Sequence, residues 1–471
     1  MKKKEIIILG AGITGLVTAW KLAKSGYKVT VIEKEKYPGG LAGTVDWDGW
    51  KFDFGTHNFS SKNHKEIIEF YKELLPGEFI PRELNAKLFI FGKLINLDYI
   101  GAHFFYMLSL PNMIKAGIDF FLTRLRAFLF GIKYTERLDV WIKQRFGKVL
   151  YGIYFGPYIE RIQKKNPSEL SKDVGDKKIP VFCLRDYIKR ELTFKKKEKI
   201  QEVIKNNMFY IKNGYGELSK FFFNELSNMN NAEVYLGSEI KSIGYDGKKV
   251  KSINLEDRKI DASEKNVLST IPVDVLANLI DNIPSEVKES AEKFEYTKLR
   301  VLFVRTKLEK ISGFSQISVE AKYPFSRVSE SNYDEFNLVP EGHSSLTIEL
   351  PLNDTDELWK ISNEELLEKI LPQYNDICEL KKEDIIDCRT VYLHYANPRM
   401  IINYKEILKS VFGFIYNTGN LYSIGRQGLF TYINADGCTR MALDLADAII
   451  DDKSLKDFQK KLMFDFHEIE L

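Results

Sequence analysis

The stretch Glu5-Ile-Ile-Ile-Leu-Gly-Ala-Gly-Ile-Thr-Gly15, near the start of this 471-residue chain, decides the fold. Its first five residues form a short, β-branched apolar run, which is typical of a buried parallel strand. The glycines at positions 10, 12 and 15 then open a helical pattern that ends at Gly26. A second apolar run, 28–32, ends at Glu33, 23 positions after Gly10. Strand, glycine loop, helix, strand and acidic residue, in this order, predict a dinucleotide-binding βαβ unit.

Each residue of this loop has a physical task. Gly10 permits the tight turn, Gly12 lets backbone N–H groups approach a pyrophosphate, and Gly15 lets the helix pack closely on the strand. The N-terminus of the helix stabilises the negative charge of the diphosphate. Glu33 accepts hydrogen bonds from ribose hydroxyls, and its charge disfavours a 2′-phosphate, so NADP fits this site poorly.

The next residues separate NAD from FAD. Residues 33–44 read Glu-Lys-Glu-Lys-Tyr-Pro-Gly-Gly-Leu-Ala-Gly-Thr, with a Gly-Gly turn at Gly39 and Gly40 followed by Leu41. This segment resembles the Gly-Gly loop of FAD enzymes of the amine-oxidase and protoporphyrinogen-oxidase group, where the loop runs along the diphosphate and the ribityl chain. The resemblance implies that FAD is the cofactor and that Gly40 and Leu41 contact it.

A narrower resemblance begins at residues 52–59, Phe-Asp-Phe-Gly-Thr-His-Asn-Phe. This segment is similar to one in UDP-galactopyranose mutases, where the histidine lies against the flavin and can tune the ring's electronics. The resemblance therefore implies that Gly55 and His57 contact the cofactor and that His57 takes part in catalysis. Further blocks follow in the family's order, and they imply strands beside the cofactor that end at Ile240 and Thr270.

The C-terminal block is the most specific part of this resemblance. Residues 421–436 read Leu-Tyr-Ser-Ile-Gly-Arg-Gln-Gly-Leu-Phe-Thr-Tyr-Ile-Asn-Ala-Asp, ahead of an amphipathic helix. They resemble the mutase segment that closes the FAD site, which implies cofactor contacts at Gly425, Arg426, Tyr432 and Asn434. The first N–H groups of the following helix would supply donors where negative charge accumulates on the reduced ring. Arg426 is expected to bind a flavin or substrate oxygen, or else to form a structural ion pair.

Two other segments are expected to bind the substrate. Residues 325–332, Phe-Ser-Arg-Val-Ser-Glu-Ser-Asn, resemble the mutase segment whose arginine holds the substrate diphosphate. The guanidinium of Arg327 suits this role because its planar fork binds phosphate oxygens bidentately. Tyr395 lies in a segment similar to the family's last tyrosine-containing strand, and it is either a phosphate contact or a packing residue. Glu349, within an apolar run, is interpreted as structural. The predicted catalytic set is His57, Arg327, Arg426 and Tyr395.

These segments predict a mixed α/β fold with three parts. The first is a Rossmann-like FAD-binding domain, discontinuous over 1–85, 205–290 and 405–460. The second is an inserted helical domain over 86–204. The third is a strand-rich substrate domain over 291–404.

Composition narrows the classes of partner. The 69 Lys and Arg residues against 66 Asp and Glu give a net charge of +3, with no basic block of the kind that binds nucleic acid. Four cysteines lack metal-ligand spacing, so we expect no metal site and reduced thiols in a cytoplasmic protein. Residues 100–130 are rich in Phe, Leu and Met, yet charges interrupt them too often for a spanning helix. They either form two helices packed into the substrate domain or make peripheral contact with the inner face of a membrane.

Three functions are consistent with these patterns. The first is an FAD enzyme that acts on a nucleotide diphosphate sugar, by pyranose–furanose ring contraction or by a related redox change, as the mutase resemblance implies. The second is an oxidase or desaturase of the protoporphyrinogen-oxidase or amine-oxidase type that acts on an apolar substrate. The third is a flavin-containing scaffold protein without catalytic activity.

Overall fold

The N-terminal βαβ unit forms as predicted, within a five-stranded parallel sheet. The computed structural model describes residues 5–60, 64–96, 108–178, 208–332 and 336–471. The unit consists of β1 (Glu5–Leu9), α1 (Ile13–Lys24) and β2 (Lys28–Ile32). The strand order is β10-β2-β1-β14-β20, and all neighbours are parallel. The distant strands are β10 (Ala232–Tyr235), β14 (Asn266–Ser269) and β20 (Leu421–Ser423). This sheet is the Rossmann-like part of the predicted mixed α/β fold, which is confirmed.

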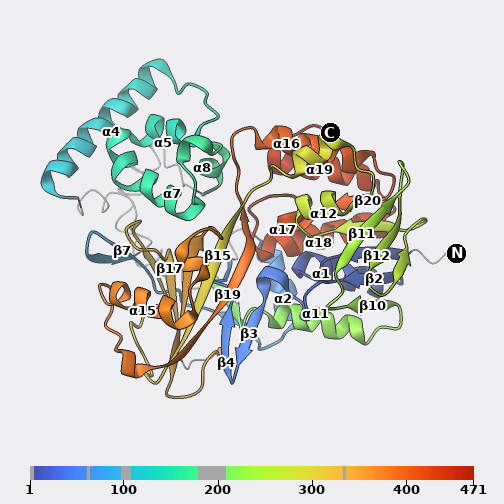
Figure 1. Ribbon diagram of the computed structural model, residues 1–471, viewed down its shortest axis with the longest axis horizontal. Helices are drawn as coiled ribbons and strands as arrows, with labels where there is room; N and C mark the ends of the chain where they lie inside the picture. Colours follow the sequence, from blue (N-terminus) through green and yellow to red (C-terminus); the bar gives the residue numbers. More distant parts are fainter. Residues whose placement is uncertain (1–4, 61–63, 97–107, 179–207, 333–335) are drawn as a thin grey trace.

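Helix α1 is enclosed by other elements. It packs against α11 (Glu217–Ser227) and α18 (Ala435–Ile450), and ten of its twelve residues are buried. This burial explains why the sequence of α1 has almost no polar face. A three-stranded antiparallel sheet lies beside the parallel sheet (Figure 1). Its strands are β11 (Ile240–Tyr245), β12 (Val250–Leu255) and β13 (Lys259–Asp261).

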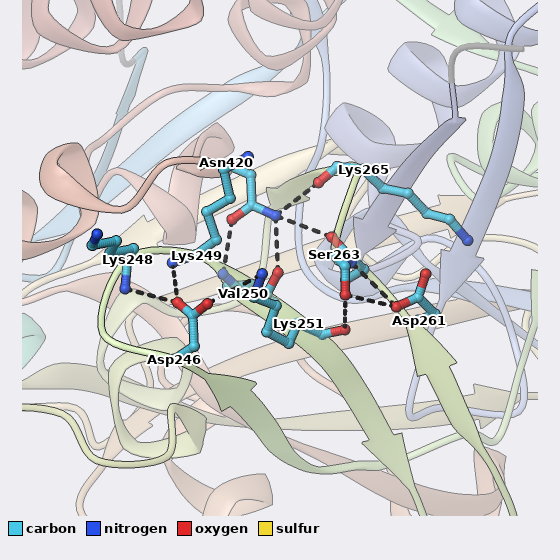
Figure 2. A network of polar contacts seen from close by, with 10 residues as sticks. Asp246, Lys248, Lys249, Val250, Lys251, Asp261, Ser263, Lys265 and Asn420 are labelled. Atoms are coloured by element: carbon cyan, nitrogen blue, oxygen red, sulfur yellow. Dashed lines mark hydrogen bonds and ion pairs between the residues drawn. The ribbon is translucent and has the colours of Figure 1, made fainter. Parts of the chain in front are cut away.

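Asn420 joins the antiparallel sheet to the amino end of the parallel sheet. Its Nδ2 donates to the carbonyl oxygens of Val250 (3.0 Å), Ala262 (3.1 Å) and Lys265 (2.8 Å). Its Oδ1 accepts a hydrogen bond from the Val250 N–H at 2.8 Å, and Figure 2 shows these bonds around the asparagine. The residue is buried, and both polar atoms of its amide have partners, as buried amides require.

A seven-stranded sheet forms the second half of the molecule. Its order is β19-β15-β18-β17-β16-β7-β8. The strands are β7 (Ala86–Ile90), β8 (Lys93–Asn96), β15 (Tyr296–Thr306), β16 (Gln316–Val319), β17 (Arg327–Asn332), β18 (Ser344–Leu352) and β19 (Ile385–Pro398). Residues 86–96, expected at the start of the helical domain, instead extend this sheet, because β7 pairs with β16. Leu88 and Ile90 are buried against the helices, while Phe89 is buried in the core of the sheet, so both faces of β7 are covered.

The helices of the inserted part lie above this sheet in Figure 1, with α4 outermost. They are α4 (Leu110–Phe130), α5 (Leu138–Phe146), α6 (Lys148–Leu150), η3 (Tyr151–Phe155), α7 (Gly156–Gln163), η4 (Pro167–Glu169) and α8 (Asp173–Lys178). Of the expected helical domain, 97–107 and 179–204 lie outside the described residues. Residues 110–130 form one helix with Pro111 in its first turn, where proline is tolerated. The two-helix expectation for residues 100–130 is not tested, because residues 100–107 lie outside the described residues. None of the helices in the described ranges is both long and apolar enough to cross a membrane.

The remaining elements complete the two halves. A hairpin of β3 (Thr44–Trp47) and β4 (Trp50–Asp53) follows the first strands, and a small sheet combines β5 (Phe59–Ser60), β9 (Met208–Ile211) and β6 (Phe79–Pro81). The other helices are η1 (Gly40–Ala42), α2 (Lys65–Leu74), α12 (Val273–Leu279), α13 (Ser285–Ala291), α14 (Glu357–Lys360), α15 (Asn363–Tyr374), η6 (Lys382–Asp384), α16 (Tyr404–Asn417), α17 (Gly425–Gly428) and α19 (Leu455–His467).

Candidate active site

The glycine loop between β1 and α1 has the geometry of a phosphate cradle. Gly10 has φ of +101°, and a Cβ added there would lie 2.4 Å from Thr270 Oγ1. A Cβ on Gly15 would lie 2.1 Å from the Gly10 carbonyl oxygen, so this glycine is required for contact between helix and loop. A Cβ on Gly12, by contrast, would meet no protein atom within 4 Å. Gly12 therefore exposes backbone at the N-terminus of α1, where a diphosphate can approach.

The Gly-Gly turn forms the second wall of this cradle. Gly39 donates its N–H to the Ala11 carbonyl at 2.8 Å, and a Cβ on Gly40 would lie 3.7 Å from the Gly12 Cα. Leu41 follows in η1, partly exposed. The Gly-Gly turn therefore packs directly against the glycine loop.

Glu33 organises the loop and keeps acceptor capacity. Its buried carboxylate accepts hydrogen bonds from the Ala11 N–H (2.8 Å) and from the Glu35 N–H (2.9 Å). A carboxylate offers about four lone-pair positions, so further acceptor positions remain for ribose hydroxyls.

Two other residues, Thr270 and Ile240, were also expected to contact the cofactor. The Thr270 hydroxyl donates to the Leu9 carbonyl at 2.9 Å and to the Gly10 carbonyl at 3.3 Å, so it holds the glycine loop in place. Ile240 begins β11 of the antiparallel sheet; the preceding strand, β10, is the one that lies beside β2. The contact of Ile240 with the adenine therefore stays a prediction.

His57 lies in the segment between β4 and β5. Its ring stacks on Tyr215, with 4.6 Å between the ring centroids, and its Nε2 is buried without a hydrogen-bond partner among the described residues. Burial lowers the pKa of His57; Asp53 and Glu349 oppose this effect, whereas Arg327 and Arg426 add to it. The imidazole is therefore held neutral, between two carboxylates and two guanidinium groups.

Arg327 forms a bidentate ion pair with Glu349 across the neighbouring strands β17 and β18. Its Nε donates to Glu349 Oε1 and its Nη2 donates to Oε2, both at 2.8 Å. Glu349 Oε1 also accepts the Thr56 N–H at 3.0 Å, and it would lie 3.1 Å from a Cβ on Gly55. Gly55, with φ of +116°, thus brings the loop that carries His57 against the carboxylate. Glu349 thus links Arg327 to the loop that carries His57, and the catalytic roles of these two residues stay predictions.

Arg426 is half-buried at the start of α17 and has no acidic partner in the described part of the chain. Its Nη1 donates to the Ile433 carbonyl at 2.5 Å and its Nη2 donates to Asn397 Oδ1 at 2.6 Å. Its Nε is buried without a partner, and burial lowers its pKa. The alternative of a structural ion pair is thus not found there. A half-buried cation without a carboxylate fits an anionic or electron-accepting ligand.

The remaining C-terminal residues shape the backbone around Arg426. A Cβ on Gly425, with φ of +82°, would lie 3.0 Å from Thr14 Oγ1, so this segment packs directly on α1. The Tyr432 hydroxyl donates to the Pro398 carbonyl, which ties the segment to the seven-stranded sheet. Asn434 is the exposed residue that precedes α18, and its side chain makes no cap hydrogen bond.

Tyr395 has different neighbours from the other predicted catalytic residues. Its ring packs edge-on against Tyr296, with 4.9 Å between centroids, and its carbonyl accepts a hydrogen bond from the Gln427 side chain. Burial raises the pKa of Tyr395, and the carboxylate of Asp274 adds to this effect. Within the described ranges its phenol makes no hydrogen bond with Arg327 or His57, which favours the packing alternative.

Two residues of the site were not in the predicted set. Glu349 was interpreted as structural, yet it orients Arg327 and binds the His57 loop; a lone carboxylate in a strand whose nine residues are all buried is the signal for it. Tyr158 lies in α7, the helix whose Arg161 donates to the carbonyl oxygens of Phe325 and Val319 at the adjoining strands. Burial raises the pKa of Tyr158, and the positive charges of Arg161 and Arg327 oppose this rise. The position of α7 beside the sheet depends on how the helical part folds.

The residues present fit FAD. The Gly12 and Gly40 backbones suit a diphosphate, Glu33 suits ribose hydroxyls, and the unpaired His57 Nε2 and Arg426 Nε suit a polar ring that takes up electrons. Among the described residues, no group of three or more His, Cys, Asp and Glu side chains could hold a metal ion.

Known proteins share this fold over nearly the whole chain. The structure of reduced UDP-galactopyranose mutase has a TM-score of 0.78 and 19% identity, covering 96% of this chain and 94% of that one. A protein from Exiguobacterium sp. 255-15 assigned as a protoporphyrinogen oxidase has a TM-score of 0.72 and 15% identity, covering 96% of this chain and 100% of that one. At these identities the likeness shows the fold.

Sequence relatives match over shorter segments. Phytoene desaturase of Fusarium fujikuroi is 47% identical over 53 residues, 11% of this chain and 9% of that protein. The 1-hydroxycarotenoid 3,4-desaturase of Flavobacterium sp. (strain P99-3) is 44% identical over 73 residues, 16% of this chain and 14% of that protein. The matches thus span less than a fifth of these curated relatives. The family model described as flavin containing amine oxidoreductase, however, matches residues 13–410. The chain belongs to this family and is an FAD-dependent enzyme.

Proposed function

We propose that this enzyme acts on a nucleotide diphosphate sugar, by pyranose–furanose ring contraction or by a related redox change on the sugar. The observation that carries the proposal is the orientation of Arg327 beside His57. Glu349 holds the Nε–Nη2 edge of the guanidinium, while Nη1 makes no hydrogen bond within the described ranges and the side chain is 32% exposed. An arginine held in this way presents fixed N–H donors to a phosphate oxygen.

The charge of the site supports an anionic substrate. Glu349 neutralises Arg327 formally, so this arginine contributes directed donors more than net charge. Arg426 adds a positive charge that no acidic side chain in the described residues offsets. The Tyr158 phenol, in the helix α7 that packs on β18, can donate a further hydrogen bond to a phosphate oxygen.

The chain's own residues bind and orient, because the chemistry belongs to the cofactor. Bound FAD supplies the covalent or redox chemistry at the sugar carbon. Arg327 and Tyr158 would hold the diphosphate, so that the sugar is presented in one orientation. His57, kept neutral by burial, can offer one hydrogen bond from Nε2 without adding charge. Arg426 would stabilise negative charge that develops nearby.

A second candidate is an oxidase or desaturase of an apolar substrate. The exposed apolar side chains of α4 favour it, since an apolar substrate needs an apolar route or surface. The short matches to carotenoid desaturases point in the same direction. In this case Arg327 and Glu349 would form only a structural ion pair.

One titration separates the two candidates. The FAD-loaded protein, first oxidised and then reduced with dithionite, is titrated with UDP, dTDP and their hexose conjugates. The proposal predicts binding that is lost by about 100-fold in Arg327→Gln/Glu349→Gln, since charge-assisted hydrogen bonds contribute about 1.5–3 kcal/mol each. The double variant removes the ion pair without leaving a buried, unpaired carboxylate.

Arg389→Gln is the matched control. Arg389 is exposed on β19 of the same sheet and contacts Trp47, away from His57. It should bind nucleotides as the wild type does. No nucleotide binding in either flavin state would overturn the proposal, and anaerobic bleaching of the flavin by an apolar substrate would establish the second candidate instead.

A further inference from the structure

Helix α4 carries a continuous apolar face that no other described element covers. Eight exposed side chains, here called the α4 apolar face, are Leu110, Ile114, Ile118, Phe121, Leu122, Leu125, Phe128 and Leu129. Phe130, the last residue of the helix, is also exposed but lies outside this face. Phe128 is 86% exposed, and Ala116 is the only buried residue of the helix. Figure 1 shows α4 along the outer edge of the molecule. Exposed apolar patches of this size mark interaction sites.

The spacing of these side chains gathers them on one side of the helix. At about 100° per residue, the eight positions fall within an arc of about 120°. Lys115 and Arg126 lie just beyond one edge of the arc, and Arg124 lies just beyond the other. The helix therefore has an apolar stripe with cationic side chains along both edges.

The opposite side of α4 holds the helix to the rest of the molecule. Asp119 Oδ2 accepts the Val149 N–H at 2.8 Å and lies where a Cβ on Gly147 would be, 2.3 Å away. Asp119, the only acidic residue between 108 and 134, is thus turned inward, away from the apolar face. The exposed charges of this segment are all positive: Lys115, Arg126 and Lys133. Arg124 is half-buried and lies over the Phe120 ring.

We infer that the α4 apolar face docks on the surface of a bilayer that contains anionic lipids. The apolar side chains enter the boundary between headgroups and acyl chains, and the flanking cations pair with lipid phosphates. A second copy of this chain fits less well, because a two-fold contact would bring the same positive edges together. Docking by α4 is independent of the substrate, so it can hold whether or not the enzyme acts on a nucleotide sugar.

The test is co-flotation of the full FAD-loaded protein with vesicles. Vesicles of phosphatidylcholine mixed with phosphatidylglycerol should bind the protein, and vesicles of phosphatidylcholine alone should bind it more weakly. Lys115→Gln/Arg126→Gln should lower binding to the anionic vesicles by about 30-fold, at about fivefold for each cation. Phe121→Glu/Phe128→Glu should abolish binding to both kinds of vesicle.

Matched controls come from exposed residues elsewhere. Lys288→Gln/Lys293→Gln removes two exposed lysines near α13, and Phe464→Glu changes a phenylalanine of α19 that is 54% exposed. Both variants should bind vesicles as the wild type does. Flotation of the wild type with neither vesicle would overturn the inference, as would equal losses in the controls. A dimer that Phe121→Glu/Phe128→Glu converts to monomer, without vesicle binding, would identify a second copy as the occupant. A lowered midpoint of thermal unfolding in that variant alone would identify another segment of this chain.

Discussion

The two ends of the parallel sheet differ in whether their buried polar groups have hydrogen-bond partners. At the amino end, the buried Asn420 amide has partners on both polar atoms, and the backbone groups around it are paired through it. At the carboxyl end, a Cβ on Gly12 would meet no protein atom within 4 Å, and His57 Nε2 and Arg426 Nε are buried without partners in the described ranges.

This difference separates structure from function within one sheet. A buried polar group without a partner costs about 1–3 kcal/mol, so we expect one only where a bound group can supply the missing partner. At the amino end, the chain itself supplies the partners. The carboxyl end fits a cofactor that supplies the missing partners, and four substitutions can break or sharpen this contrast.

The largest expected effect is at the satisfied end. Asn420→Ala should lower the free energy of unfolding by about 4 kcal/mol, because four hydrogen bonds are lost at about 1 kcal/mol each. Urea unfolding with and without FAD measures it, and the loss should be the same in both. Asn254→Ala, which removes one half-buried bond to Ser242, is the control and should cost about 1 kcal/mol. An FAD-dependent loss at Asn420 would contradict the assignment of this end to structure.

Gly15→Ala should come next, with a loss of about 3 kcal/mol, because the added methyl group meets the Gly10 carbonyl and the loop must move. FAD affinity should fall with stability, since the same loop forms the cradle. Gly413→Ala, in α16 with no atom near the added methyl group, should instead gain about 1 kcal/mol. Unfolding curves and flavin content check both variants, and an unchanged Gly15→Ala protein would refute the tight contact.

Gly12→Ala should leave the stability of the FAD-free protein nearly unchanged and weaken FAD binding by about 30-fold, or about 2 kcal/mol. The backbone of Gly12 has φ of −73°, which alanine adopts without strain, and no protein atom opposes the methyl group. Fluorescence titration with FAD measures the affinity. Equal affinities in variant and wild type would show that the diphosphate lies elsewhere.

The smallest effect concerns pH. Burial lowers the pKa of His57, so the unfolded chain takes up a proton at this residue before the folded protein does. The contribution of neutral His57 to the free energy of unfolding is fully present above about pH 6.5. It declines as the pH falls toward the lower pKa of His57 in the folded state. His57→Gln should lose less stability than the wild type over this range. His343→Gln, in an exposed turn, is the control, and identical pH profiles for all three proteins would refute the burial effect.

The predicted fold was right where the relevant geometry is local. The strand 5–9, the glycine loop and Glu33 follow each other within a few residues, and the φ values that the loop needs restrict the residue types. The FAD segment at Gly39 and Gly40 belongs to the same continuous stretch. The placement of residues 86–96 in the seven-stranded sheet was not predicted, because pairing with β16 depends on distant parts of the chain.

The candidate site was less visible in the sequence. Arg327 and His57 were predicted together from a resemblance, but the pairing of Arg327 with Glu349 across two strands was not. Tyr395, predicted to be catalytic, packs beside Tyr296 and Asp274. The exposure of the α4 apolar face could not be read from its composition, since a buried helix can have the same composition.

The sequence by itself determined the dinucleotide-binding unit, because a phosphate cradle is made of backbone and only glycine permits that backbone. Only the tertiary structure decided which charges face each other around His57, and which side of α4 has no neighbour. Side chains from β17, β18, α7 and α17 lie far apart along the chain, and their electrostatic balance exists only after the strands and helices have packed.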